Sequence, residues 1–191
     1  MLVLDFVSTV RATRSGLLDT LSDVSGMTEW GRAHTAELGL SADFTATETL
    51  RREVVELRQG VRALFAKAVA PGPVSSADAD RLPGFAASLD LVNAAAFAAP
   101  LAPRLDWPAE GVPSATSVPA GEAAESPRIR AALAASAIDL LAGPYRERLR
   151  ACPAPRCVLY FAKEHPRQEW CSVGCGNRAR AARHYHQHRD R

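Results

Sequence analysis

Residues 152–178 read CPAPRCVLYFAKEHPRQEWCSVGCGNR and contain all four cysteines of the 191-residue chain. Their spacing is C-x4-C-x13-C-x3-C, which is two close pairs separated by a longer segment. A tight turn or a helix start can hold each pair, and the segment between them lets both pairs meet around one tetrahedral Zn²⁺. The spacing therefore predicts a metal site with the ligands Cys152, Cys157, Cys171 and Cys175.

Two disulfides are the alternative use of these cysteines. The chain starts with MLVLDFVSTVR, in which Asp5 interrupts the apolar run and no basic residue comes first. We therefore expect no signal peptide and a cytoplasmic location, where clustered cysteines are more often metal ligands than disulfides. Because four thiolates leave no open position for water, we expect one structural Zn²⁺ and no catalytic metal.

The residues between the cysteines predict the local structure of this segment. PAPR at 153–156 predicts a proline-rich knuckle, VLYFA at 158–162 a strand, and EHPRQ at 164–168 a turn. Cys175 opens a basic helix, GNRARAARHYHQHR. Knuckle, hairpin and helix together predict a treble-clef-like zinc finger, and a module of about 40 residues should fold only when it binds its metal.

The clearest helical pattern outside this segment covers residues 45–70. Thr45 and Glu48 have the spacing of a capping box, and PGP at 71–73 ends the helix. Its apolar residues recur every three or four positions, so that they share one face. They are Leu50, Val54, Leu57, Val61, Leu64 and Phe65.

Residues 126–142 predict a second long helix, with Ser126 as its N-cap, Pro127 in its first position and Gly143-Pro144 at its end. Its expected buried residues are Ile129, Leu133, Ala137, Leu140 and Leu141.

Weaker patterns predict four further elements. Residues 27–38 predict a short helix that ends at Gly39, and a helix from Ser75 or Ser76 to Phe97 is expected to break or kink near Pro83. Five prolines in 100–125 favour a short hairpin or an irregular arm packed on the helices, whereas residues 2–12 fit a helix or a strand.

Composition places these elements in a mostly α (α+β) fold. Hydrophobic residues make up 47% of the chain and aromatics only 6%, which favours closely packed helices. The basic and acidic residues are unevenly distributed: residues 145–191 carry eleven Arg or Lys against four Asp or Glu, and residues 1–144 carry twelve against seventeen. We therefore expect a multihelical domain with a short β-hairpin over 1–143 and a basic finger over 144–191, which is suited to meeting a polyanion.

The segment WCSVGCGNRARA resembles the signature of the CGNR zinc-finger family, whose name is spelled here by Cys175 to Arg178. In that family the finger follows an N-terminal domain called ABATE, whose opening resembles LDFVSTV at 4–10 with Trp30 downstream. The resemblance covers nearly the whole chain and maps the four zinc ligands onto the four cysteines. The family is described as candidate stress-induced transcription regulators, so the resemblance implies DNA binding as an expectation.

Basic residues of the finger are the candidate DNA contacts, because each cation that neutralises a phosphate releases counterions. They are Arg156, Arg167, Arg178, Arg180 and Arg183. An alternative is that these arginines lie on a solvent-exposed face and contact no partner. Asn177 and Arg178 have a structural alternative as well, since Arg178 follows a metal ligand closely enough to pack on Trp170 or to bond the knuckle, and Asn177 could cap the helix.

The N-terminal segment offers a candidate effector pocket formed by Asp5, Ser8, Arg11 and Trp30. The alternative is that Trp30 is ordinary core, since large aromatic side chains usually fill cores.

Two functions follow from these observations. One is a DNA-binding transcription regulator, in which the finger contacts DNA and the helical body senses a small-molecule signal or forms a homodimer. The other is a zinc-finger module that binds proteins and not DNA. We expect no enzyme, because the cysteines are committed to metal and no phosphate loop or nucleophile–base pair stands out, and we expect no membrane partner, because no apolar run approaches the roughly 20 residues of a membrane span.

Overall fold

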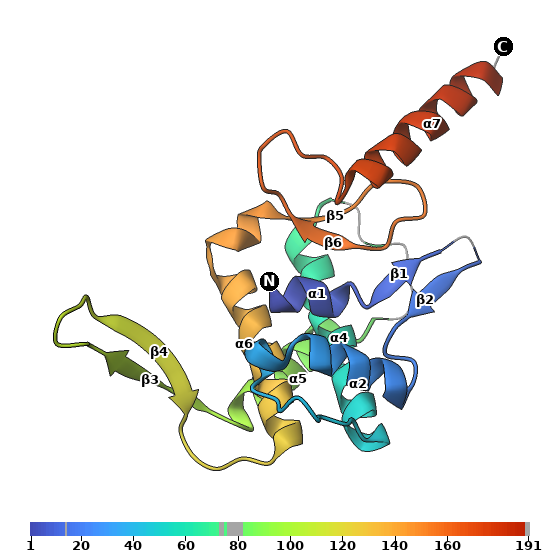
Figure 1. The fold of residues 1–191 in the computed structure, drawn as a ribbon. Coiled ribbons are helices and arrows are strands. Elements are labelled where there is room, and N and C mark those ends of the chain that lie inside the picture. Colours follow the sequence, from blue (N-terminus) through green and yellow to red (C-terminus); the bar gives the residue numbers. More distant parts are fainter. Residues whose placement is uncertain (14, 73–74, 76–81, 190–191) are drawn as a thin grey trace.

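The structure is a computed structural model that describes residues 1–13, 15–72, 75 and 82–189, with side chains up to Tyr185. Within these residues it contains helices, three two-stranded antiparallel sheets and one short 3-10 helix (Figure 1). The elements are α1 Leu2–Val7, β1 Val10–Ala12, β2 Leu17–Asp19, α2 Val24–Ala33, α3 Thr35–Leu38, α4 Glu48–Val69, α5 Phe85–Phe97, β3 Leu101–Asp106, β4 Ser114–Pro119, α6 Glu125–Ala142, η1 Pro144–Arg148, β5 Leu149–Ala151, β6 Tyr160–Ala162 and α7 Val173–Arg189. The predicted mostly α (α+β) class is confirmed.

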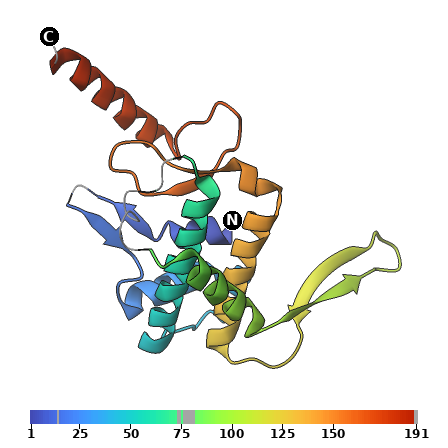
Figure 2. The same cartoon turned by 180° about the vertical axis from the view of Figure 1, so that it is seen from behind.

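Helix α4 is the central element of the body. Each residue of its predicted apolar face is buried, and α5 and α6 pack against it (Figure 2). The predicted capping box is wrong in register: Thr47, and not Thr45, is the N-cap, and its Oγ1 accepts from the backbone N–H of Leu50 at 3.2 Å. Thr45 instead lies within 3.5 Å of a guanidinium nitrogen of Arg32.

Helix α6 completes the core against α4, α5 and α1. Ile129, Leu133, Ala137 and Leu140 are buried as predicted, whereas Leu141 is only partly buried. Ser126 does not cap the helix, which begins one residue earlier at Glu125. Its hydroxyl donates to Glu53 on α4 at 2.6 Å, so a tertiary contact has replaced the local one.

The N-terminal segment forms both structures that its pattern allowed, a helix at α1 and then strand β1. Strand β1 pairs with β2, from Val10 opposite Asp19 to Ala12 opposite Leu17. The short helix before Gly39 is split into α2 and α3, and Gly39 ends the second with a left-handed φ of 62°. The start of the helix predicted from Ser75 or Ser76 lies mostly outside the described residues, and the described part is α5.

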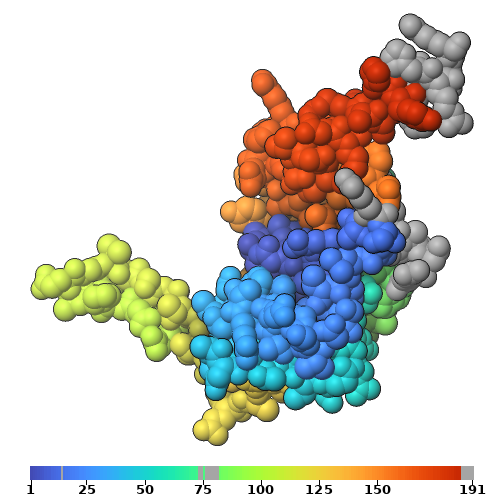
Figure 3. Space-filling view, turned by 45° about the vertical axis from the view of Figure 1, so that its right-hand side comes forward, coloured from blue at the N-terminus to red at the C-terminus, as the bar shows by residue number. Residues whose placement is uncertain are grey.

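Residues 101–119 form an arm that projects from the body (Figures 1 and 3). The arm is the predicted hairpin, with β3 and β4 paired from Leu101 opposite Pro119 to Asp106 opposite Ser114. The expectation that it packs on the helices is wrong, because its strands extend away from them (Figure 1). No helix in the described part of the chain combines the length and the apolarity that a membrane crossing needs.

The C-terminal segment shares the core of the body. Strands β5 and β6 pair on either side of the knuckle, and Leu149, Ala151 and Tyr160 belong to the same buried cluster as the helices. The sequence did not predict β5. The domain division between residues 143 and 144 stays a prediction.

Two buried arginines of α4, Arg58 and Arg62, connect the parts of the molecule, each with 1% of its surface exposed. Arg58 makes a two-pronged ion pair with Asp19, with both N–O distances at 2.6 Å, and donates to Thr9 at 2.8 Å. Arg62, one turn later, donates to the carbonyls of Val7 at 2.7 Å and Val158 at 3.0 Å. Helix α4 therefore holds the N-terminal segment and the finger at once.

Candidate metal centre

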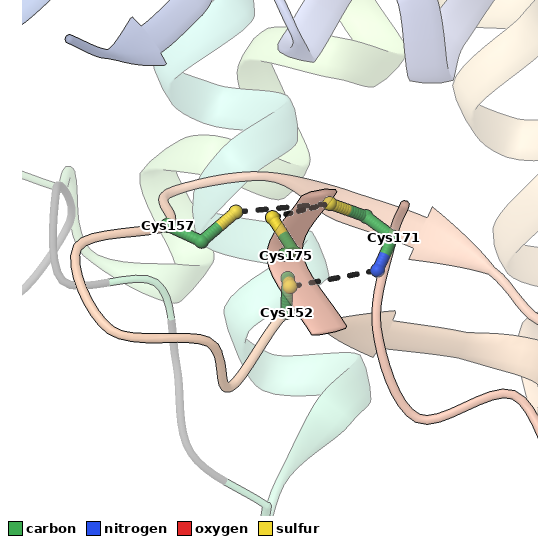
Figure 4. A group of neighbouring side chains, drawn as sticks. All are labelled: Cys152, Cys157, Cys171 and Cys175. Atoms are coloured by element: carbon green, nitrogen blue, oxygen red, sulfur yellow. Dashed lines mark hydrogen bonds between the residues drawn. The ribbon is translucent and has the colours of Figure 1, made fainter. Parts of the chain in front are cut away.

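The four cysteine side chains converge on one point (Figure 4). All four Sγ atoms lie within 4.8 Å of one another, with Cys157 3.7 Å and Cys175 3.4 Å from the Sγ of Cys171. Four Zn–S bonds of about 2.3 Å in a tetrahedron give sulfur–sulfur edges of about 3.8 Å, whereas a disulfide needs about 2.05 Å. The donor set and its spacing fit one Zn²⁺, and the four cysteines are free of disulfides.

The knuckle holds the first pair of ligands in a tight turn. The backbone N–H of Cys157 donates to the carbonyl of Ala154 at 2.9 Å, and that of Cys152 donates to Leu159 at 2.9 Å. Arg156, just before the second ligand, has a left-handed φ of 63°. This conformation, uncommon for a residue other than glycine, reverses the chain so that both sulfurs face the same point.

The start of α7 holds the second pair. The hydroxyl of Ser172 accepts from the backbone N–H of Cys175 at 3.2 Å, and its carbonyl accepts from Gly176 at 3.1 Å. The backbone N–H of Cys171 points at the Sγ of Cys152, 3.5 Å away, and so links the two pairs. The predicted knuckle and helix are present. The predicted hairpin differs, because β6 pairs with β5 before the knuckle and not with a strand after the turn at 164–168.

The thiols perturb one another strongly. Hydrogen bonds from Cys157 and Cys171 lower the pKa of Cys152 to about 2, and the bond to Cys152 in turn raises the pKa of Cys157 to about 11. Hydrogen bonding to Cys152 and Cys157 also raises the pKa of Cys171. The Cys152 thiolate is thus favoured by its neighbours Cys157 and Cys171, whose own ionisation a nearby cation would favour. Zn²⁺ supplies that charge and displaces the remaining protons.

Comparison with known families identifies both parts of the chain. The ABATE model, described as "Putative stress-induced transcription regulator", matches residues 1–144, and the model of the CGNR zinc finger matches residues 148–188. The chain belongs to the ABATE family. No curated protein sequence matches it. The predicted family, the CGNR zinc finger and its single zinc ion are confirmed.

Trp170 explains two features of the CGNR finger. Its ring lies against Gly176, where a Cβ would stand 3.2 Å from the nearest ring carbon, so a side chain at this position would push the ring away. The guanidinium groups of Arg180 and Arg183 both lie over the same ring, at 5.9 and 5.8 Å from its centroid. The tryptophan therefore packs on the helix start and orients two cations of α7.

Asn177 and Arg178 of the CGNR signature make contacts inside the finger. A guanidinium nitrogen of Arg178 donates to the Sγ of Cys175 at 2.9 Å. The side-chain oxygen of Asn177 accepts from Arg180 at 2.6 Å and does not cap α7. An arginine on a ligand sulfur stabilises the thiolate, which gives Arg178 a role at the metal.

The remaining predicted DNA contacts lie elsewhere on the finger. Arg156 donates to the carbonyl of Thr13 in the ABATE domain at 3.1 Å, so it contributes to the contact between the two parts. Arg167 is exposed in the loop between β6 and α7.

The structure brings three of the four predicted pocket residues together. Asp5, Arg11 and Trp30 line one hollow of about 570 Å³ in the ABATE domain, and Ser8 lies outside its lining. Asp5 pairs with the N-terminal ammonium at 3.3 Å. Trp30 is half-buried and stacks on His34, with 4.4 Å between ring centroids. Ligand binding in this hollow stays a prediction.

Sequence reasoning missed Arg58 and Arg62. A signal was present, because both positions adjoin members of the apolar stripe, Leu57 and Val61, and share the i, i+4 spacing of one helix face. Arginines on the edge of an apolar stripe usually extend to solvent. Here Arg58 and Arg62 instead donate hydrogen bonds to carbonyls and a carboxylate of other segments.

Proposed function

We propose that the protein is a DNA-binding regulator in which the CGNR finger contacts the phosphate backbone through α7. The observation that carries this proposal is the cluster of Arg180 and Arg183 on Trp170, beside the zinc ligands. Stacking on a ring reduces the freedom of a long side chain, so less entropy is lost when it meets a phosphate.

Charge and placement support the proposal. The finger region carries a formal excess of seven positive charges, reduced to about five once four thiolates hold one Zn²⁺. Helix α7 extends away from the body (Figures 1 and 2), and Arg180 and Arg183 are exposed along it. A free cationic helix of this kind can approach a groove without a clash from the ABATE domain.

The contacts inside the finger narrow the set of DNA-binding residues. Arg178 is assigned to the metal and Arg156 to the contact with the ABATE domain. Arg180, Arg183 and Arg167 are left as the proposed phosphate contacts. The function proposed is binding and not catalysis, since the thiols act as metal ligands.

The ABATE domain is proposed to sense a signal that α4 transmits. Thr9 and Asp19 line the hollow and hold Arg58, and Arg62, one turn along the same helix, holds Val158 of the finger. A ligand that displaces Asp19 would thus act on a helix that contacts the finger directly.

The test is a titration of zinc-loaded protein with labelled duplex DNA at several salt concentrations. We expect log affinity to fall linearly with log salt, and the Arg180→Ala, Arg183→Ala double variant to reduce that slope by about 2, or about 0.9 per lost phosphate contact. Arg52→Ala is the matched control, because it removes an exposed arginine from the body and should leave the slope unchanged.

Exposed apolar side chains favour a second candidate, a protein-binding finger. Val173 and Tyr185 both lie exposed on α7. If folded, zinc-loaded protein binds no duplex at low salt, the DNA proposal fails and the protein-binding function takes its place.

A further inference from the structure

The register of the arm gives its two faces opposite chemistry. Residues directly opposite in an antiparallel pair project to the same face, and successive residues alternate between faces. One face, here called the apolar arm face, therefore carries Leu101, Pro103, Leu105, Ala115, Ser117 and Pro119. The other carries Ala102, Arg104, Asp106, Ser114, Thr116 and Val118.

The second face is satisfied within the arm. Arg104 pairs with Asp106 at 3.0 Å, and the hydroxyl of Thr116 donates to the same carboxylate at 3.0 Å. These contacts fix the hairpin register and leave this face polar, so that it suits solvent.

The apolar arm face and the tip beyond it are uncovered. Leu105 is 66% exposed, and Trp107 and Val112, in the connection between the strands, are 65% and 83% exposed. The arm stands clear of the body in all three whole-molecule views (Figures 1, 2 and 3). An isolated two-stranded hairpin is at best marginally stable in water, and monomers rarely expose contiguous apolar surface of this kind. Exposure of this kind suits a surface that a partner covers.

A hollow of about 440 Å³ at the root of the arm continues the apolar arm face. Leu101, Ser117 and Pro119 of that face line it, together with small apolar residues of the body such as Ala99 and Ala132. The charged residues Glu37, Glu122 and Arg128 complete its lining. The same chain thus carries a projecting apolar tip and an apolar receptor for one.

We propose that the partner is a second copy of this chain, related by a two-fold axis. The two arms pack antiparallel, apolar face to apolar face, so that Trp107 at each tip covers the hollow at the other root. A six-residue strand spans about 20 Å, so each tip lies about that far from its own root. When the two arms pack antiparallel, each tip therefore reaches the root of the other copy. A two-fold interface needs a surface that is complementary to itself, and each arm carries both a projecting tip and a hollow that receives one.

The buried area suits a reversible dimer. Covering one tryptophan removes roughly 150–250 Å², and the exposed leucines and Val112 bring each arm to about 450 Å². Two arms together contribute about 900 Å², and the hollow surfaces that the two tips cover bring the interface to about 1,200 Å², the lower end of the range for specific interfaces. The apolar arm face carries no charge, so the two copies do not repel each other there.

Sedimentation velocity of the zinc-loaded protein, without DNA, tests the proposal separately from DNA binding. We expect a reversible dimer in the wild type. Leu105→Glu should raise its Kd by about 100-fold or more, since symmetry buries the new carboxylate twice. Leu17→Glu is the matched control. It places the same charge on an exposed leucine of the other hairpin, β1–β2, and should leave the dimer intact. Circular dichroism checks that both variants fold.

Disulfide trapping tests the orientation of the arms. Ala115 lies on the apolar arm face opposite Leu105, about midway between the root hollow and the tip and hence close to the axis, so Ala115→Cys should form a covalent dimer under mild oxidation. Thr116→Cys, on the neighbouring residue but the opposite face, should not. A monomeric wild type, a Leu105→Glu variant that still dimerises, or equal trapping at both positions would each overturn the proposal; capture of a different protein by a monomeric chain would assign the arm to that partner.

Discussion

Replacing Arg178 with alanine separates a role at the metal from a role on DNA. Its guanidinium donates to the Sγ of Cys175 at 2.9 Å, so it faces a thiolate once zinc is bound. Groups that bond a metal ligand in this way typically change metal affinity by 10–100-fold. Arg178→Ala should therefore weaken zinc binding by that factor, or about 1.4–2.7 kcal/mol.

Competition with a chromophoric chelator measures this change, with the wild type and Arg178→Lys in parallel. Lysine keeps the charge but not the planar fork of donors, so we expect it to restore part of the affinity. The zinc off-rate, followed after chelator addition, should rise in the same order.

Arg180→Ala is the matched control on the same helix. Arg180 lies over Trp170 and bonds Asn177, without a sulfur contact in the described structure, so its loss should leave zinc affinity within about twofold and weaken DNA binding. The reasoning is refuted if Arg178→Ala binds zinc like the wild type, or if Arg180→Ala loses zinc to the same degree.

Three further changes test the rest of the structure. Arg58 pairs with Asp19 and lowers its pKa. Burial alone would raise the pKa of this carboxyl, but hydrogen bonding and the charge of Arg58 lower it more. The ion pair therefore stabilises the fold above about pH 4, and this stabilisation is lost as pH falls through the lowered pKa. Asp19→Asn should lower the free energy of unfolding at pH 7 by about 2–3 kcal/mol, less than for a fully buried pair because the carboxylate is 33% exposed. Urea titrations at pH 7 and at about pH 2.5 should show this difference shrinking at the lower pH, and an equal loss at both would contradict the assignment. Arg62→Met removes the donors to Val7 and Val158 and should cost about 2–4 kcal/mol and speed zinc release; unchanged release would show that α4 does not couple to the finger. Chelation of zinc should remove hydrogen-exchange protection around the finger cysteines while the amides of α4 stay protected, and protection that survives chelation would mean that the finger folds without metal.

The metal site was predictable because its determinants are local. Each ligand pair is held by a turn or helix start a few residues long, so cysteine spacing alone predicts the site. The apolar stripes of α4 and α6 were predictable for the same reason, since helix periodicity fixes which residues share a face. The cap positions were less predictable. Thr45 and Ser126 are residue types that often cap helices, yet each side chain contacts a residue outside its own helix start.

The contacts between distant segments could not be read from the chain. Arg156 suited a phosphate contact as well as the carbonyl of Thr13, and folding brought that carbonyl within reach. Arg178 and Arg180 are two residues apart in one basic run, but helix geometry turns one toward a sulfur and the other toward an indole ring.

By itself, the sequence determined the four zinc ligands, the family, the mostly helical class and the uneven distribution of charge, because spacing, periodicity and composition act over a few residues at a time. Only the tertiary structure decided which arginines serve the metal, which join α4 to the finger and which stay exposed on α7. It also decided that one face of the arm is satisfied and the other uncovered. A long charged side chain can reach many partners of similar energy, and burial of the surrounding segments selects among them.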